Sequence, residues 1–383
     1  MEQEGFETIA RDSAENGPLR AAEALIERLK ADRSYPAVFE ARLMLARYKL
    51  DLPLIPDDSL NVLEGEARDA YQQAQVEAAR EVGELFLADG EIYSAWPYLR
   101  AVGETEPVRR AIEAFAPPAG DDAIDGVVQI AYNEALHPRR GFELILEHYG
   151  ICRAITNFGQ YPSDEGRGES TQLLVDKLSA DLAASLKHTI EPKEGASPKT
   201  DSIAALIDGR DWLFEGAAYY IDTSHVASIV RMSLDWTDAD EATLRKVFEL
   251  TEYGRHLADM YQFPGESPFE NVYEDCGLYL GALLGEAPDK AVEHFLNKIP
   301  TEPDPYGNIQ AQALVRLQLR LGRKADALRT AMDHLWNVPP QRLSCPSIPL
   351  LCQMAGDPES LKELGRRIDD PLSFLAGTLG ESR

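Results

Sequence analysis

The sequence predicts an all-α protein built from stacked helical hairpins, and two observations lead to this fold class. Apolar residues recur at the three- and four-residue spacing of a helix along nearly the whole chain, and strand-like alternation is almost absent. Three glycines are each followed five positions later by an alanine: Gly17 by Ala22, Gly90 by Ala95 and Gly322 by Ala327. A glycine turn followed by a small residue is typical of two helices that cross closely, and such a hairpin buries its apolar face only against further hairpins.

In the first third of the chain, the apolar spacing predicts a series of helices. They cover residues 19–29, 37–50 and 66–87, and a further helix runs from the turn at Asp89-Gly90 through Leu99. Two prolines in LDLPLIPDDSLN predict an irregular segment before the third of these helices. The Pro- and Gly-containing linker 116–120 is the clearest candidate boundary, so we expect N-terminal helical repeats over residues 1–115.

The middle of the chain is also helical but departs from the glycine–alanine pattern. The predicted helices cover residues 124–136, 138–155, 173–186, 203–207, 223–234 and 239–261. Two segments rich in Gly, Ser, Pro and charge, 158–170 and 191–200, predict surface loops. We therefore expect a divergent central helical section over residues 121–265.

The last third returns to paired helices. Predicted helices 269–284 and 288–299 flank Gly285, and helices 309–321 and 324–336 flank Gly322, 37 residues further on. Asp357 is a good N-cap for a last predicted helix, 357–368, with Pro358 at its first position. Residues 266–383 thus form a predicted section of C-terminal helical repeats.

The best hairpin resembles a unit of the tetratricopeptide-repeat family. Its matching residues are Val82, Gly83, Phe86, Gly90, Ala95, Leu99 and Pro107. The unit at Gly322 carries Ala327 and Pro339 at the right offsets, whereas Ala291 falls six rather than five residues after Gly285. This resemblance covers about a third of the chain, on the order of 100 to 130 residues. It implies an α-solenoid, a superhelix whose concave face binds peptides or partner proteins, and it implies no activity.

Composition excludes several classes of partner. The formal net charge is −27 and the pI is near 4.6, so the chain repels nucleic acid phosphates and anionic membrane surfaces. The four cysteines lack the spacing of zinc or redox motifs, and no apolar run reaches the length of a membrane helix. The start MEQEGFETIARDS lacks the features of a secretory signal, so we expect a cytoplasmic protein.

A candidate metal site comes from His148, Asp222 and His225. At helical spacing, His148 shares one face with Leu144, Ile145, Ile151, Cys152 and Ile155, where it is either a ligand or a core histidine bonded within the protein. Asp222 and His225 are one turn apart, which suits metal binding or a general base with its orienting carboxylate. The alternative is that Asp222 is simply the N-cap of the helix that follows.

A candidate ligand-binding site comes from His137, Arg140 and Tyr253. The arginines near His137 can grip a carboxylate or phosphate, or they can pair with Glu143 and Glu147 on the surface. Aromatic residues around Tyr253 can line a pocket, although at helical spacing they are more often part of a core.

Two functions follow from these observations. The first is a helical-repeat protein that binds a protein, peptide or small-molecule ligand in its concave surface. The alternative is an enzyme with a His/Asp site in the central helices and a divalent metal ion that activates water. The chain has no GxxxxGK[ST], GxGxxG after a strand, HExxH or GxSxG motif, which disfavours the nucleotide, dinucleotide and serine-hydrolase chemistries.

Overall fold

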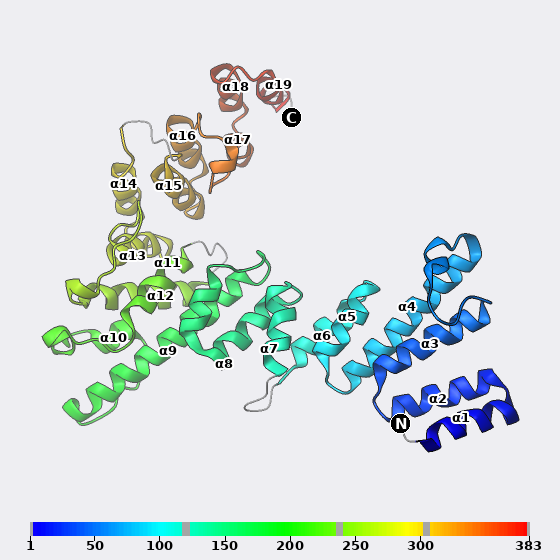
Figure 1. Ribbon diagram of the computed structural model, residues 1–383. Helices are drawn as coiled ribbons and strands as arrows, with labels where there is room; N and C mark the ends of the chain where they lie inside the picture. Colours follow the sequence, from blue (N-terminus) through cyan, green and yellow to red (C-terminus); the bar gives the residue numbers. More distant parts are fainter. Residues whose placement is uncertain (1–2, 117–122, 235–239, 302–306, 381–383) are drawn as a thin grey trace. The chain divides into compact units, whose positions relative to one another are not determined.

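The structure is a computed structural model that describes residues 3–116, 123–234, 240–301 and 307–380 (Figure 1). Helices dominate this described part, in which strand pairing is limited to one isolated β-bridge between Pro264 and Asn271. The predicted all-α class is confirmed.

Two compact units make up the chain, and each is described by itself. The first unit comprises Met1–Tyr149 and Gln160–Arg167, and the second comprises Gly150–Gly159 and Gly168–Arg383. The boundary between the two units lies inside the predicted central section and not at the predicted linker 116–120. Residues 117–120 of that linker lie outside the described residues. The three predicted sections, 1–115, 121–265 and 266–383, stay a prediction.

The first unit is a succession of helices that pack against their neighbours in sequence. They are α1 (Gln3–Asn16), α2 (Pro18–Ala31), α3 (Tyr35–Lys49), the 3-10 helix η1 (Asp58–Val62), α4 (Gly65–Ala88), α5 (Ile92–Ala101), α6 (Glu106–Ala114), α7 (Ala123–Val128), the π-helical turn η2 (Gln129–Asn133) and the first part of α8 (Pro138–Phe158). The predicted helices 37–50 and 66–87 correspond closely to α3 and α4, whereas α1 and α6 were not predicted.

The hairpin of α4 and α5 has the features that its sequence predicts. Gly90 lies in the turn with φ 82°, a conformation that costs a residue with a side chain about 1–2 kcal/mol. Ala95 is fully buried. A Cβ atom on Gly83 would lie 2.5 Å from Leu99 Cγ, so the two helices cross closely at this point. Gly322 and Ala327 repeat this arrangement in the second unit, where φ is 75° and the alanine is fully buried.

The predicted helix 138–155 is not continuous. Gly150 interrupts α8 with φ 81° and ψ 172°, a region of backbone space that is essentially restricted to glycine. Its two parts belong to different units. The prediction that His148 and Cys152 lie on one apolar helix face is therefore wrong, because residues on either side of the break do not share a face. Both side chains are exposed.

The second unit continues with helices from α9 to α19. They are α9 (Arg167–Glu194), α10 (Ile203–Ile207), η3 (Asp211–Ala217), α11 (Thr223–Ser233), α12 (Glu241–His256), η4 (Asp259–Tyr261), α13 (Val272–Leu283), α14 (Pro288–Asn297), α15 (Ile309–Arg320), α16 (Lys324–His334), η5 (Pro340–Arg342), α17 (Ile348–Ala355), α18 (Pro358–Arg367) and α19 (Pro371–Gly380). Asp357 caps α18 as predicted, since its Oδ1 accepts from Ser360 N at 3.0 Å.

Helix α9 is longer than the sequence indicates. Residues 167–170 and 191–194, predicted as parts of loops, lie within it. A stripe of fully buried residues runs along the helix and reaches past the predicted end: Leu174, Leu178, Leu182, Leu186 and Ile190. Pro192 removes one backbone donor from the last turn of the helix. The loops that remain are 159–166 and 195–202.

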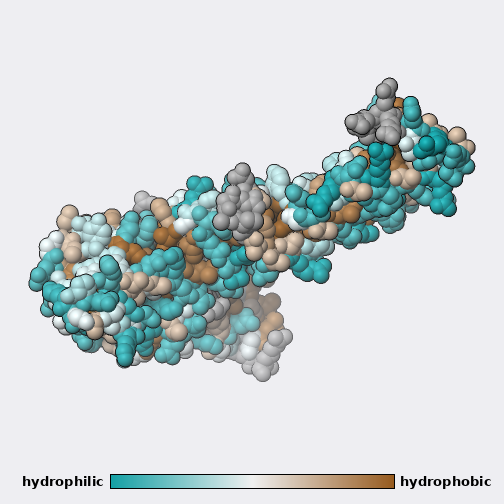
Figure 2. Space-filling model, turned by 90° about the horizontal axis from the view of Figure 1, so that it is seen from below, coloured by the Kyte–Doolittle hydropathy of each residue, from teal (hydrophilic) through white to brown (hydrophobic). Residues whose placement is uncertain are grey.

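Each unit has successive apolar clusters along the chain. In the second unit one cluster includes Tyr279, Ala291, Phe295, Leu314 and Leu317, and the next includes Ala311, Val315, Ala327, Leu328 and Leu351. Hydrophilic residues cover most of the face in Figure 2, with smaller apolar areas between them. Within the described residues, every helix is too short or too polar to cross a bilayer.

Candidate functional site

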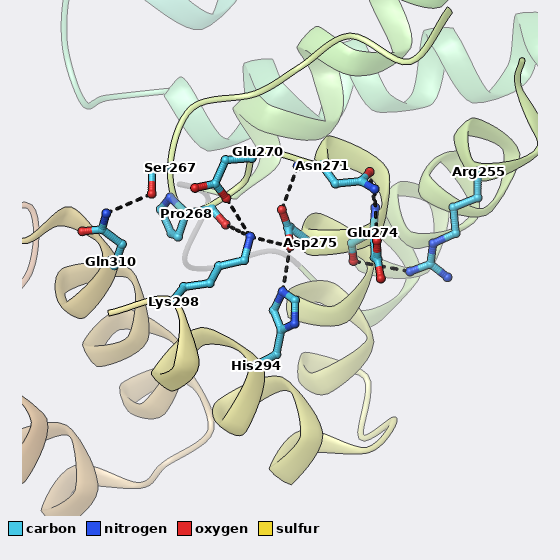
Figure 3. Close-up of polar contacts among 10 residues, drawn as sticks. All are labelled: Arg255, Ser267, Pro268, Glu270, Asn271, Glu274, Asp275, His294, Lys298 and Gln310. Carbon is cyan, nitrogen blue, oxygen red and sulfur yellow. Dashed lines mark hydrogen bonds and ion pairs between the residues drawn. The ribbon is translucent and has the colours of Figure 1, made fainter. Parts of the chain in front are cut away.

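A polar cluster of the second unit is centred on Asp275, which is 2% exposed. Asp275 lies in the first turn of α13, and its Oδ2 accepts from the backbone N–H of Asn271 at 2.9 Å. Its Oδ1 lies 2.7 Å from His294 Nε2 on α14 and 2.8 Å from Lys298 Nζ just after α14 (Figure 3). One buried carboxylate thus joins the hairpin of α13 and α14 to the segment before it.

Lys298 completes this cluster. Its ammonium group also donates to the carbonyl oxygen of Pro268 at 2.6 Å and to Glu270 Oε2 at 2.7 Å. Burial lowers the pKa of Lys298, but hydrogen bonds to Asp275 and Glu270 outweigh it and hold this pKa above its ordinary value. Burial raises the pKa of Glu270, but hydrogen bonds, first among them the one from Lys298, together lower it by more, so this pKa lies below its usual range.

The local sequence explains why this cluster forms. Asn271 is the N-cap of α13, since its side chain accepts from Glu274 N at 3.3 Å. In this position the backbone N–H of Asn271 points to the carboxylate of Asp275. A carboxylate in the first turn also stabilises the helix dipole. His294 and Lys298, four residues apart, lie on one face at the end of α14.

The Asp275 cluster holds structure together rather than presenting a reactive group. The three N–H donors of Lys298 all have protein acceptors, and both oxygens of Asp275 have protein donors. Cys276, the next residue, is a fully buried thiol whose pKa is raised by burial. Neither His294 nor Asp275 is among the site residues that the sequence predicts. The available signal was the pair of carboxylates Glu274 and Asp275 within the otherwise apolar run VYEDCGLYLGAL.

The predicted ligand-binding residues are divided between the two units, and their grouping in one site stays a prediction. His137 and Arg140 belong to the first unit and Tyr253 to the second. His137 Nε2 lies 2.7 Å from Glu113 Oε2. Arg140 pairs with Glu143 at 2.8 Å, as in the surface alternative, and donates to Phe115 O at 2.6 Å. Tyr253 is fully buried, its hydroxyl accepts from Tyr220 N at 2.9 Å, and burial raises its pKa to about 12. Tyr253 belongs to the core.

The predicted metal ligands gain no support from their surroundings. His148 is exposed in the first unit, whereas Asp222 and His225 lie in the second. Asp222 is the N-cap of α11, because its Oδ1 accepts from Ser224 N at 2.9 Å, and its Oδ2 is 3.9 Å from His225 Nε2. In the described segments no three His, Cys, Asp or Glu side chains are placed to hold a metal ion. The enzyme alternative, with its divalent ion, stays a prediction.

A groove lies in the first unit beside the N-terminal ends of α5 and α7, and sequence reasoning did not find it. It has a volume of about 810 Å³ and is lined by residues 89–94, 115, 123, 125–127 and 129. Among the described residues that line it, the acidic ones are Asp89, Glu91 and Asp125, and none is Lys, Arg or His. Tyr93 is 61% exposed in this groove and packs against Gly126, where a Cβ atom would lie 3.0 Å from the ring.

The charges of the groove are unevenly compensated. Asp89 accepts from Tyr35 Oη at 2.6 Å and lies 3.4 Å from Arg33. Asp125 lies in the first turn of α7 and accepts from Tyr149 Oη. Glu91 is the N-cap of α5 and makes no cap hydrogen bond with its side chain. The N-terminus of a helix carries only about half a positive charge. The N-termini of α5 and α7 therefore do not neutralise the three carboxylates, and the groove stays negative.

Comparisons with models of protein families, with curated proteins and with solved structures found no match to this chain.

Proposed function

We propose that the chain is a helical-repeat protein, an α-solenoid of tetratricopeptide-like hairpins, that binds a protein partner through a cationic peptide segment. The single observation that carries this proposal is the acidic groove beside α5 and α7, with Tyr93 exposed on it. The proposed class is supported by the packing of helices against their sequence neighbours, with glycine turns and buried alanines at the hairpins of Gly90 and Gly322.

The chemistry of the groove favours a basic peptide. Tyr93 and Phe115 offer aromatic surface, and a lysine or arginine over such a ring gains cation–π energy of about 0.5–2 kcal/mol. Asp125 and Glu91 offer carboxylates to the same side chains. A net charge of −27 also steers cationic segments towards the chain and repels nucleic acid.

The proposal is tested by fluorescence anisotropy with a fluorescein-labelled peptide of alternating lysine and alanine. We expect saturable binding that weakens about tenfold on Tyr93→Ala, because an aromatic anchor contributes more than about 1 kcal/mol to such an interface. Binding should weaken similarly on the double change Glu91→Gln and Asp125→Asn.

Matched variants separate the groove from a diffuse effect of negative charge. Tyr48→Ala removes a tyrosine that is 47% exposed on α3, and the double change Glu66→Gln and Asp69→Asn removes two exposed carboxylates from α4. These variants should bind the peptide as the unaltered chain does. Equal losses in the groove and control variants would contradict the proposal, as would equal binding of a glutamate–alanine peptide.

A further inference from the structure

Another groove of the first unit lies between the segment around η1 and the N-terminal half of α4. It has a volume of about 790 Å³, within the range of about 300–1,000 Å³ that is typical of sites for small molecules. Among the described residues that line it, the segment 56–63 contributes the carboxylates of Asp57 and Asp58. Helix α4 contributes the guanidinium group of Arg68, the hydroxyl group of Tyr71 and two glutamine amides. One side of the groove is therefore acidic, and the other offers hydrogen-bond donors.

The opposite charges of the two sides do not neutralise each other. In the part of the chain that the structure describes, neither Arg68 nor Asp58 has an ion pair or a side-chain hydrogen bond. Asp57 uses its Oδ1 to accept from Ser59 N at 2.9 Å, which leaves its Oδ2 without a partner among the described residues. Charged groups of both signs in this groove thus remain available to a ligand.

A buried arginine is joined to the donor side of the groove through Tyr71. Arg47 is 2% exposed, and it donates to Leu54 O at 3.1 Å and to Tyr71 Oη at 2.9 Å. None of the described residues gives Arg47 a carboxylate partner, although an arginine is almost never fully buried unless it is paired. Tyr71 is 7% exposed, and its own O–H has no acceptor within the described segments. The positive charge of Arg47 makes this O–H a stronger donor.

We infer that the groove beside η1 binds a small zwitterion, of the class of free amino acids and dipeptides. The carboxylate of the ligand accepts from Arg68 and Tyr71, and its ammonium group binds the carboxylates of Asp57 and Asp58. Hydrogen bonds between charged groups are roughly twice as strong as neutral ones. A ligand with only one of the two charges would leave one side of the groove without a partner. The zwitterion differs in this respect from the cationic peptide that is proposed for the groove beside α5 and α7.

Isothermal titration calorimetry of the full chain with the dipeptide alanylalanine tests this inference. We expect saturable binding of the unmodified dipeptide at neutral pH, where it carries both charges. The N-acetylated form lacks the ammonium group and the C-terminal amide lacks the carboxylate. Each should bind at least about tenfold more weakly, since each loses a charge-assisted contact.

Matched variants make the test specific. Arg68→Gln and Asp58→Asn should each weaken binding of the dipeptide about tenfold. Arg110→Gln, at a side chain that is 73% exposed on α6, and Asp69→Asn, at an exposed position of α4, should bind it as the unaltered chain does. Tyr93→Ala should also bind it unchanged, because Tyr93 belongs to the other groove.

Circular dichroism should show the same helix content in all of these variants. The inference would be overturned by an absence of binding at about 10 mM dipeptide, or by equal binding of the acetylated or amidated form. Equal losses in the groove and control variants would overturn it as well. Loss of dipeptide binding on Tyr93→Ala would place the ligand in the other groove and would also contradict the inference.

Discussion

Replacing Asp275 with alanine is expected to lower the free energy of unfolding by about 3 kcal/mol. Breaking a buried ion pair by removing one partner costs about 3–5 kcal/mol, and the lower end applies because Lys298 keeps Glu270 as an acceptor. The change also leaves the N–H of Asn271 and the ring of His294 without their carboxylate partner. For a unit of this size, about 3 kcal/mol corresponds to a fall of roughly 6–12 °C in the midpoint of thermal unfolding.

The neighbouring residue provides the control for this experiment. Glu274→Ala removes the same type of group one position earlier, but from an exposed side chain, so its effect should remain within about 0.5 kcal/mol. Scanning calorimetry of both variants gives the comparison. If the two variants unfold at the same temperature, Asp275 does not stabilise the hairpin of α13 and α14.

Ala95→Leu and Ala327→Leu should each destabilise the protein by about 1–3 kcal/mol, the usual cost of overpacking a filled core. Both alanines are fully buried, Ala95 in a cluster with Leu99 and Val108 and Ala327 in a cluster with Ala311 and Val315. Each is the small residue that follows a hairpin glycine. The midpoint of urea unfolding, followed by circular dichroism, measures the effect.

An exposed alanine on α4 separates crowding from any general effect of leucine. Ala70→Leu exchanges the same residues on the surface of a helix, where both are good helix formers, and it should leave stability nearly unchanged. Unchanged midpoints for both buried alanines would mean that the assigned helix crossings are wrong.

Local patterns in the sequence predicted most helices, because each pattern reports on a single element. The helix at 203–207 and the N-cap at Asp357 needed no knowledge of the rest of the fold. The glycine turns at Gly90 and Gly322, where the structure shows positive φ angles, followed from the same local reasoning. By contrast, the break at Gly150 lies inside an apolar pattern that continues on both sides, so helical spacing alone could not reveal it.

The polar cluster at Asp275 and the acidic groove were not predicted, since both depend on contacts between residues that are distant in the sequence. Asp275 and His294 lie on two helices that a hairpin turn separates. Tyr93 on α5 and the residues of α7 line one groove, and helical spacing within either helix does not predict that the two helices are neighbours. Of the predicted site residues, His148 belongs to the first unit and Asp222 to the second, and Tyr253 is enclosed in the core.

Hydrogen–deuterium exchange with and without the lysine–alanine peptide tests the proposed binding function most directly. The account predicts that the peptide slows amide exchange in the segments 89–94 and 123–129, which contain most of the residues that line the groove, and that Tyr93→Ala removes this protection. The control variant Tyr48→Ala should keep it. Protection confined to other helices, or no protection at peptide concentrations that saturate the anisotropy signal, would contradict the assignment of this groove as the binding site.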